Sequence, residues 1–368
     1  MRLLFSHTNI DVKNLYPFTL TRRVEDIRVG IFTIREKWLK GLGLRESAIV
    51  TSSADDTLII AANIVPGKGM INKVKKLKPG QRMSDEAGNT LVQYGMTVSG
   101  EPVVVDDFLR IEYSWNIFQY NGKALTWDFD LARKGRKPMS SLKNIYVSNK
   151  KNVFIEKGAV VKHAIINADE GPVFIEKGAL IMEGALLRGP LYIGNGAVIK
   201  MGAKIYGATT IGPGCTVGGE VKNSVLFAYS NKAHDGYLGD SVIGEWCNLG
   251  GGTSNSNLKN TGGDITVYLQ RQAFKVGKKC GVLMGDYTRT AVNTSINSGT
   301  VIGISANVFG TGLTPKYIPS FSWGYDDKVK YKLDKALQDI EQWKSFKNAI
   351  LTEEEKQLIT NIYKSKTK

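Results

Sequence analysis

An aliphatic side chain recurs at every sixth position in the middle of this chain. The eight positions are Ile175, Ile181, Leu187, Ile193, Ile199, Ile205, Ile211 and Val217. A period of six fits neither an α-helix, with 3.6 residues per turn, nor a flat strand, with two. It is typical of a triangular coil in which each hexad makes one short strand and one turn, with the aliphatic side chain pointing inward. The pattern therefore predicts a left-handed parallel β-helix.

The same period extends beyond this run. It is present upstream at Ile155 and Val161, and after one break we expect it to resume at Val276, Val282, Ile296, Ile302 and Val308. Small residues lie between the aliphatic positions, as in Gly178-Ala179 and Gly196-Ala197. Glycine lets the chain turn sharply at the corners of a coil. The 40 glycines among 368 residues are therefore assigned largely to coil corners.

The two ends of the chain follow other patterns. Apolar runs at 57–62 and 103–105 predict buried strands, and residues 26–42 predict a strand or turn leading into a helix that ends near Gly41 and Gly43. Near the C-terminus, Thr352–Glu355 is a capping box that opens a helix. We expect a mixed fold: an α/β domain over 1–144, the β-helix over 145–324 and a C-terminal α-helical cap over 325–368.

The charge balance favours an anionic partner. The chain has 49 Lys+Arg against 34 Asp+Glu, a net charge of +15, but the basic residues are scattered and no nucleic-acid-binding motif is present. Seven basic residues and no acidic one lie between Asp130 and Glu156, which reads as a solvated linker or, alternatively, as an edge that contacts a polyanion. We expect phosphorylated small molecules as partners, and no nucleic acid.

Cysteine usage and hydropathy indicate a cytoplasmic protein. Cys215, Cys247 and Cys280 are an odd number without CxxC spacing, so we expect buried thiols and neither a disulfide framework nor a metal site. No segment approaches the roughly 18 uninterrupted apolar residues of a membrane helix. We therefore expect no membrane partner.

The break in the repeat, between Lys222 and Val276, is where chemistry is expected. Polar residues 230–240 interrupt the solenoid there, and they include one of the three histidines, His234. The others are His7, at the end of the first expected strand, and His163, which should face solvent within a hexad. Histidine is the side chain best suited to take a proton near neutral pH. His234 is therefore the candidate general base.

The residues around His234 carry a family resemblance. Lys232-Ala233-His234-Asp235-Gly236-Tyr237-Leu238-Gly239-Asp240, followed by Asn248-Leu249-Gly250-Gly251-Gly252-Thr253, is similar to a motif of one bacterial bifunctional enzyme family. These enzymes join a glucosamine-1-phosphate N-acetyltransferase to an N-acetylglucosamine-1-phosphate uridylyltransferase, and the segment from about Met201 to Lys259 resembles the acetyltransferase half. The resemblance implies acetyl-CoA as co-substrate, an amino-sugar phosphate as acceptor and a homotrimer with sites at subunit interfaces.

The resemblance also implies roles for single residues. His234 falls on the catalytic base; Lys222, Tyr237 and Asn248 fall on substrate-binding positions, and Lys204 takes the place of a phosphate-binding arginine. Gly251, through its N–H, and Asn257 fall on positions near the acetyl group and its oxyanion. Leu258 departs from the family, which has tyrosine there. The residues alone also allow other interpretations: an asparagine ladder (Asn248, Asn255, Asn257), solvated corner lysines (Lys204, Lys222) and a packing role for Tyr237.

The N-terminal part resembles the nucleotidyltransferase half less closely. That half opens with a strand and G-x-G-T-R, whereas here Leu3-Leu4-Phe5 leads into Ser6-His7-Thr8-Asn9. Arg22 and Arg23 are candidate nucleotide-binding residues, and Asn63 stands where a metal-binding aspartate is expected; Mg²⁺ would be needed only if this domain is active. Two alternatives to the acetyltransferase stay open. One is a sugar-1-phosphate nucleotidyltransferase using UTP or dTTP, with the β-helix as an oligomerisation platform. The other is a non-catalytic trimeric scaffold that binds sugar nucleotides.

Overall fold

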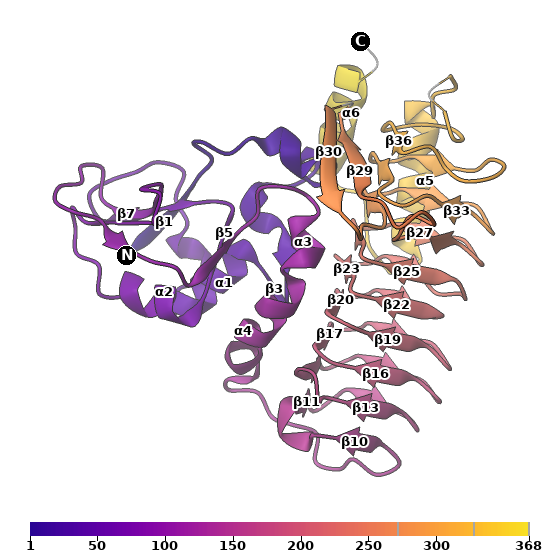
Figure 1. Ribbon diagram of the computed structural model, residues 1–368, viewed down its shortest axis with the longest axis horizontal. Coiled ribbons are helices and arrows are strands. Elements are labelled where there is room, and N and C mark those ends of the chain that lie inside the picture. The colour runs from indigo at the N-terminus through magenta and orange to yellow at the C-terminus, as the bar shows by residue number, and fades with distance from the viewer. Residues whose placement is uncertain (271, 327, 367–368) are drawn as a thin grey trace.

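The computed structural model describes residues 1–270, 272–326 and 328–366. It has three parts, seen in Figure 1: an N-terminal α/β domain, a tall parallel β-solenoid beside it and a pair of C-terminal helices near the upper coils. The predicted fold class, with a left-handed parallel β-helix at its centre, is confirmed.

The α/β domain is built on a five-stranded sheet. The strand order is β1 (Arg2–Ser6), β4 (Thr57–Ala61), β7 (Thr90–Tyr94), β6 (Arg82–Ser84) and β8 (Val103–Val104). β1 and β4 are parallel, so their carboxyl ends lie at one edge of the sheet. The remaining elements are the short pairs β2 (Arg28–Val29) with β3 (Phe32–Thr33) and β5 (Ile64–Pro66) with β9 (Phe108–Arg110), and helices α1 (Ile34–Leu42), α2 (Lys68–Val74), α3 (Asn116–Gln119) and α4 (Asn121–Arg133).

The sequence predictions for this domain succeed for the helix and the central strand, and fail at one edge. α1 opens on a capping box between Thr33 and Glu36 and ends at Gly43, whose φ of +76° suits glycine. The run at 57–62 forms the buried strand β4. The run at 103–105 was expected to be buried, but Val103 and Val104 are 38% and 52% exposed. The reason is that β8 is an edge strand of the sheet, and a run of three apolar residues does not distinguish an edge strand from a central one.

The solenoid is a prism with three sheet faces. The first contains β10 (Tyr146–Ser148), β13 (Ile165–Asn167), β16 (Leu186–Arg188), β19 (Lys204–Tyr206), β22 (Glu220–Lys222) and β25 (Tyr237–Gly239). The second contains β11 (Val153–Ile155), β14 (Val173–Ile175), β17 (Leu191–Ile193), β20 (Thr209–Ile211), β23 (Val225–Leu226), β26 (Val242–Ile243), β31 (Leu283–Met284), β34 (Val301–Ile302) and β36 (Tyr317–Ile318). The third contains β12 (Val160–Val161), β15 (Leu180–Ile181), β18 (Val198–Ile199), β21 (Thr216–Val217), β24 (Asn231–Lys232), β27 (Asn248–Leu249), β32 (Arg289–Thr290) and β35 (Asn307–Val308).

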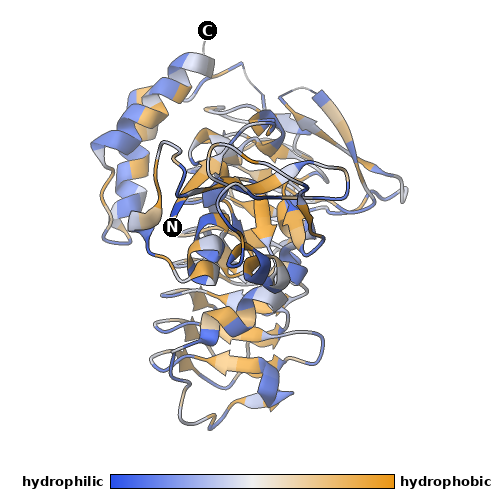
Figure 2. Cartoon of the chain, turned by 90° about the vertical axis from the view of Figure 1, so that its left-hand side faces the viewer, coloured by the Kyte–Doolittle hydropathy of each residue, from blue (hydrophilic) through white to orange (hydrophobic). Residues whose placement is uncertain are grey.

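The period of six is the interior of this prism. Each strand pairs in parallel with the strand one coil later, as where Ile175 pairs with Ile193 and Ile193 with Ile211. All eight predicted inward positions are buried, none more than 2% exposed. Figure 2 shows hydrophobic residues recurring on the strands of the coils. The corner glycines take left-handed backbone angles, such as Gly196 at φ +66° and Gly202 at φ +68°.

The break in the repeat is shorter than expected: residues 230–240 belong to regular coils with β24 and β25, and only a β-hairpin leaves the solenoid. β29 (Ile265–Leu269) pairs antiparallel with β30 (Gln272–Gly277), and the coils continue below it through β28 (Ser254–Asn255) and resume at β31. The hexads were expected to resume at Val276, but Val276 lies in β30 and packs on the α/β domain core. An isolated valine at the correct spacing cannot reveal that the chain has left the coil.

The α/β domain and the solenoid share a core. Val225, Phe227 and Leu283 of the solenoid belong to the same buried cluster as Leu3 and Trp38 of the α/β domain. The hairpin adds Phe274, whose ring contacts those of Tyr113 and Trp115. Part of the basic linker run is also structural, because Arg136 forms ion pairs with Glu156 at 2.8 Å and Glu176 at 2.7 Å. The domains are therefore held together by apolar packing as well as by charge.

The C-terminal helices stand beside the upper coils. α5 (Leu333–Ser345) and α6 (Glu353–Lys366) pack on a buried cluster that includes Trp246, Tyr287 and Phe321 of the solenoid. The predicted capping box is present, since Thr352 and Glu355 exchange side-chain and backbone hydrogen bonds. The three cysteines are buried and free. Among the described residues, no helix combines the length and the apolar character needed to cross a membrane.

Candidate functional site

His234 lies at a corner of the solenoid, directly over the glycine-rich turn of the next coil. Asn231 of β24 pairs in parallel with Asn248 of β27, so the corners that follow these strands are stacked. A Cβ placed on Gly251 would lie 3.6 Å from Cγ of His234, which puts the imidazole against the Gly251 backbone. The His234 side chain is exposed to solvent. The structure thus brings together two residues that the sequence analysis paired.

The glycine turn leaves one backbone donor free. The N–H of Gly250 donates to Thr290 O, and that of Gly252 donates to Asp235 O at 3.1 Å. Within the part of the chain that the structure describes, the N–H of Gly251 has no acceptor. A fixed N–H without a partner, next to an exposed imidazole, is a suitable donor for an oxyanion that forms beside the base.

The first sheet face presents the candidate substrate residues on successive coils. Lys204 pairs with Glu220, and Glu220 with Tyr237, so these three positions lie in one row across β19, β22 and β25. Neighbouring strands are about 4.8 Å apart, which places the row within the span of one sugar phosphate. In the adjacent row Tyr206 pairs with Lys222, whose Nζ lies 5.6 Å from the Tyr206 ring centroid.

Tyr237 is held by a network of polar side chains. Asn257 Nδ2 donates to Tyr237 Oη at 3.0 Å and to Asp240 Oδ2 at 2.5 Å, and Asn223 Nδ2 donates to Asp240 Oδ1 at 2.6 Å. Burial, followed by the charge of Asp240, raises the pKa of Tyr237 to about 12. Tyr237 therefore stays protonated at neutral pH and can donate a hydrogen bond to a ligand. Asn257 lies on the same face, next to exposed Leu258.

The lower coils continue this face away from the histidine. Lys204 and Tyr206 line a groove of about 410 Å³ together with Arg188 and Leu186. Lys204 itself is exposed and makes no ion pair among the described residues. The groove is open to solvent and carries positive charge at one end, which suits a phosphorylated sugar.

Asn248 lies on a different face from the other candidates. It belongs to the third sheet, where it pairs with Asn231 on one side and Arg289 on the other. The Asn231–Asn248 step is a short asparagine ladder, as the alternative interpretation expects. Asn255 is a structural residue, because its buried amide accepts from Gly239 N and donates to Gly239 O. A single subunit thus brings together Lys204, Lys222, Tyr237 and Asn257 but leaves Asn248 around the corner.

Two polar residues of this region were missed by the sequence analysis. Glu220 lies between Lys204 and Tyr237 and accepts a 2.6 Å hydrogen bond from Tyr206 Oη. Finding it required the coil length, since register across coils is not visible in the sequence. Lys232 is buried inside the solenoid. Its signal was present, because it lies six residues after Leu226 and six before Leu238, at a position where the repeat has aliphatic residues.

Arg22 and Arg23, the candidate nucleotide-binding residues, have different surroundings. Arg22 is in the domain interface, where its Nη2 lies 2.6 Å from Asp286 Oδ2 and its guanidinium stacks 4.7 Å from the Phe227 ring centroid. Glu245 is a second carboxylate at 3.8 Å. Arg23 is exposed. The structure therefore gives Arg22 a docking role between the two domains and does not place the two arginines together.

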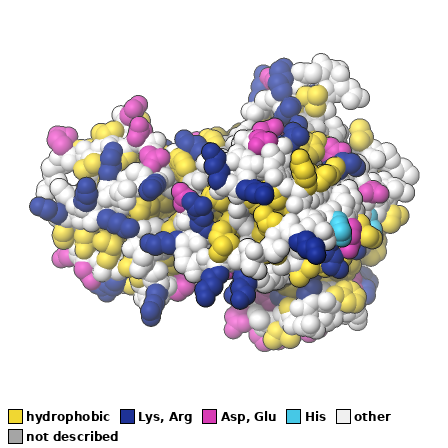
Figure 3. Space-filling model, turned by 90° about the horizontal axis from the view of Figure 1, so that it is seen from below, with side chains coloured by type: hydrophobic (Ala, Val, Ile, Leu, Met, Phe, Trp, Pro, Cys, Tyr) yellow, Lys and Arg dark blue, Asp and Glu magenta, His cyan; other side chains and the backbone are white. Residues whose placement is uncertain are grey.

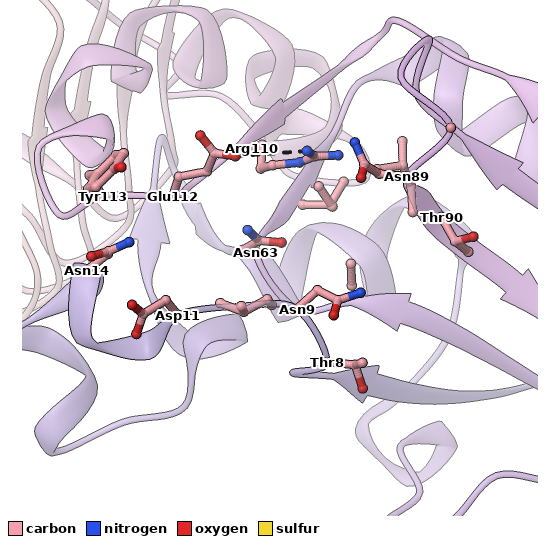
Figure 4. A pocket seen from close by; sticks show the side chains of 15 residues that line it. Thr8, Asn9, Asp11, Asn14, Asn63, Asn89, Thr90, Arg110, Glu112 and Tyr113 are labelled. Atoms are coloured by element: carbon pink, nitrogen blue, oxygen red, sulfur yellow. Dashed lines mark ion pairs between the residues drawn. The ribbon is translucent and has the colours of Figure 1, made fainter.

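The α/β domain contains a pocket of about 560 Å³. It lies outside the carboxyl ends of the parallel strands β1 and β4, where open α/β sheets bind their ligands. Figure 4 shows Asn9, Asp11, Asn63 and Glu112 around one space, with Arg110 forming an ion pair to Glu112. Of the residues that line this pocket, only Asn63 was named as a candidate from the sequence.

Asp11 and Glu112 are the carboxylates in the described lining of this pocket, and Mg²⁺ is commonly bound by one or two carboxylates together with substrate phosphates. Throughout the described residues, no three His, Cys, Asp or Glu side chains form a group that could hold a metal ion. Asn63, at the position of the expected aspartate, uses its amide to donate to Ile111 O at 3.3 Å.

One face of the molecule shows how the basic side chains are placed (Figure 3). On the face seen in Figure 3, Lys and Arg side chains are scattered over the α/β domain rather than forming one continuous band. This distribution agrees better with several small anion-binding positions than with a track for a nucleic-acid backbone.

Comparison with known proteins finds partial similarity to a sugar nucleotidyltransferase family and to bifunctional proteins. Residues 3–137 match the family described as "Sugar nucleotidyl transferase". The "Bifunctional protein GlmU" of Methanocaldococcus jannaschii is 32% identical over 116 residues, which cover 31% of this chain and 28% of that protein. The predicted resemblance is confirmed. A "Bifunctional sugar-1-phosphate nucleotidylyltransferase/acetyltransferase" of Sulfurisphaera tokodaii is 36% identical over 91 residues, 24% of this chain and 23% of that protein.

The matches are partial. The aligned segments span about a quarter of the length of these curated relatives. Among solved structures, the polysialic acid O-acetyltransferase OatWY matches 49% of this chain and 79% of its own, at 14% identity and a TM-score of 0.23. The N-acyltransferase AntD of Bacillus cereus matches 55% of this chain and 90% of its own, at 12% identity and a TM-score of 0.17.

Proposed function

We propose that this chain is an acetyl-CoA-dependent N-acetyltransferase that acts on an amino-sugar phosphate such as glucosamine 1-phosphate, in the synthesis of sugar-nucleotide precursors. The observation that carries the proposal is the corner at which the exposed His234 imidazole lies against Gly251, whose N–H has no acceptor among the described residues. A base and an oxyanion donor are the two groups that acyl transfer to an amine requires. The relatives' names, which include an acetyltransferase, agree with this chemistry.

Each candidate residue has a role in the proposed reaction. His234 takes a proton from the ammonium group of the acceptor, and the freed amine attacks the thioester carbonyl carbon. The carbonyl oxygen becomes an oxyanion, which accepts a hydrogen bond from the N–H of Gly251. The tetrahedral intermediate then expels the CoA thiolate, which receives a proton, and the amide product leaves. Lys204 and Lys222 hold the phosphate, while Tyr237 and Asn257 contact the sugar and the acetyl group.

We also propose that the chain forms a homotrimer in which neighbouring subunits complete the substrate site. Asn248 lies on the third sheet face, on the other side of the His234 corner from Lys204 and Tyr237. Packing one subunit's third face near a neighbour's first face would bring Asn248 into the substrate site. Exposed Tyr146, Ile165 and Leu186 continue the Lys204 row downward and give the first face an apolar surface for such a contact.

The direct test is acetylation of the acceptor itself. Incubation with acetyl-CoA and glucosamine 1-phosphate should give the N-acetylated sugar phosphate, detected by mass spectrometry. Glucosamine without the phosphate should react more slowly, because Lys204 and Lys222 then have no anion to bind. Failure to acetylate any amino-sugar phosphate would contradict the proposal.

A second candidate function is sugar-1-phosphate nucleotidyl transfer by the α/β domain. It is favoured by the match of residues 3–137 and by the pocket at the carboxyl ends of β1 and β4. Release of pyrophosphate from UTP or dTTP with a sugar 1-phosphate and added Mg²⁺ tests it. Nucleotide-dependent stabilisation without turnover would instead favour a binding scaffold.

A further inference from the structure

A lysine lies inside the solenoid, in a row that is otherwise mostly aliphatic. The inward positions of the third sheet, in order, are Val161, Ile181, Ile199, Val217, Lys232, Leu249, Thr290 and Val308. Lys232 is 2% exposed, and its backbone pairs directly with that of Val217. Its aliphatic stem continues the apolar row, so only the ammonium group needs a special explanation.

The ammonium group is bound by two backbone carbonyls. Nζ of Lys232 donates to His234 O at 2.5 Å and to Gly218 O at 3.3 Å. Neither oxygen accepts any other hydrogen bond in the described chain, whereas Asp235 O, one residue on, accepts from Gly252 N. Buried carbonyls without a donor are rare in folded proteins. Lys232 therefore satisfies two inward-facing carbonyls that the coil itself leaves unpaired.

The two carbonyls lie at stacked corners of unequal length. Val217 pairs with Lys232 and Val221 pairs with Leu238, so the inward positions on either side of the corner are four residues apart in the earlier coil and six residues apart in the later one. The longer corner includes Gly236, at φ +122°. His234 lies in this longer corner, so the carbonyl that Lys232 binds belongs to the residue whose side chain lies against Gly251.

The row of inward side chains on the third sheet could be filled without an ammonium group. Burial lowers the pKa of Lys232 to about 8, with the charge of Asp235 acting in the opposite direction. A methionine would occupy a similar volume without a charge to desolvate. The specific contribution of lysine is thus its hydrogen bond to the His234 carbonyl.

We propose that Lys232 is a positioning residue for His234: its ammonium, inside the solenoid, fixes the His234 carbonyl and so holds the imidazole over Gly251. Without it the two carbonyls would turn to find other donors, and the corner would rotate with them. The consequence for catalysis rests on the proposed acetyltransferase function; the effect on the orientation of His234 does not.

The test compares Lys232→Met with Ile199→Met, which changes an interior position of the same row two coils earlier. Three readouts are needed: the melting temperature, the imidazole ¹H–¹³C NMR signals and the kinetics of CoA release with acetyl-CoA and glucosamine 1-phosphate. The chain has only three histidines, so the His234 signal can be assigned with a His234→Ala sample.

For Lys232→Met we expect the His234 signal to shift or split while those of His7 and His163 stay in place. The kcat should fall at least tenfold, with both KM values within about twofold of wild type. Ile199→Met should leave all signals and kcat unchanged. An unshifted His234 signal in a folded Lys232→Met protein would overturn the proposal.

The remaining outcomes are also decisive. If the wild type transfers no acetyl group, the proposed function fails, and the NMR comparison alone decides the positioning. If Lys232→Met does not fold, Lys232→Gln retains an N–H donor on a shorter stem and should give a smaller shift of the His234 signal. If Lys232→Gln also fails to fold, or folds with no shift, Lys232 has a structural role alone and the proposal is wrong.

Discussion

Replacing Arg22 by methionine should weaken the junction between the α/β domain and the solenoid. The guanidinium is 8% exposed and Asp286 is 4% exposed, with Nη2 and Oδ2 2.6 Å apart. At that separation two unit charges attract by about 6 kcal/mol at an effective dielectric constant of 20. Part of this is offset by desolvation of the pair, but Arg22→Met removes only one partner and leaves buried Asp286 without its cation, near the half-buried carboxylate of Glu245. Breaking a buried pair in this way costs about 3–5 kcal/mol.

The free energy of unfolding is measured by denaturant titration, followed by tryptophan fluorescence. Arg23→Met is the matched control, because Arg23 is the neighbouring arginine and is exposed; its effect should stay within about 0.5 kcal/mol. Asp286→Asn combined with Arg22→Met should cost less than the sum of the two single changes.

The same variants test the alternative role of Arg22. If Arg22 is a docking residue, Arg22→Met lowers stability and leaves the affinity for UTP unchanged. If stability stays within about 0.5 kcal/mol of wild type while UTP affinity falls, the docking argument is refuted and Arg22 is a nucleotide ligand.

Three further outcomes follow from the described contacts. Burial and the charge of Asp286 raise the pKa of Glu245, so ionisation of its carboxyl at neutral pH destabilises the folded state. Glu245→Gln should therefore raise the melting temperature at pH 8. This gain should vanish below the ordinary glutamate pKa of about 4.3, where the carboxyl is protonated in both the folded and the unfolded state. Lys37 and Asp128 form a buried ion pair between α1 and α4, and Lys37→Met should cost about 3–5 kcal/mol in a denaturant titration, most of which Lys37→Met with Asp128→Leu recovers. Lys204→Ala should raise KM for glucosamine 1-phosphate about tenfold with little change in kcat, and Lys204→Arg should retain the wild-type KM; a kcat effect without a KM effect would exclude phosphate binding.

The solenoid could be predicted because one local rule is repeated many times. Ile175, Ile193 and Ile211 occupy equivalent positions on successive coils, and each repetition strengthens the same inference. The start of α6 was predictable for a similar reason, since a capping box is complete within four residues. Both signals are short-range and depend little on the rest of the fold.

The errors and omissions depend on long-range structure. Val103 and Val104 have the composition of a buried strand, but strand order makes β8 an edge. Val276 keeps the hexad spacing while it belongs to a hairpin that docks on the α/β domain. Arg22 could be recognised as a basic residue but not as the partner of Asp286, which is 264 positions away.

The candidate site was predictable in part. His234 and Gly251 could be paired from the motif, because their separation equals one coil. Glu220 could not be added, because its position between Lys204 and Tyr237 depends on coil lengths of 16 and 17 residues. Lys232 was visible as a lysine at an aliphatic hexad position, but only the structure shows that its ammonium binds the His234 carbonyl.

The central claim is that His234 is the general base of an acetyl transfer, and the rate of CoA release tests it most directly. The rate is measured with saturating acetyl-CoA and glucosamine 1-phosphate for the wild type, His234→Ala and the control His163→Ala, whose histidine is exposed on a lower coil. Loss of a general base should lower kcat of His234→Ala by about 10²–10⁴-fold, with His163→Ala unchanged. A His234→Ala protein that folds and releases CoA at the wild-type rate would contradict the account.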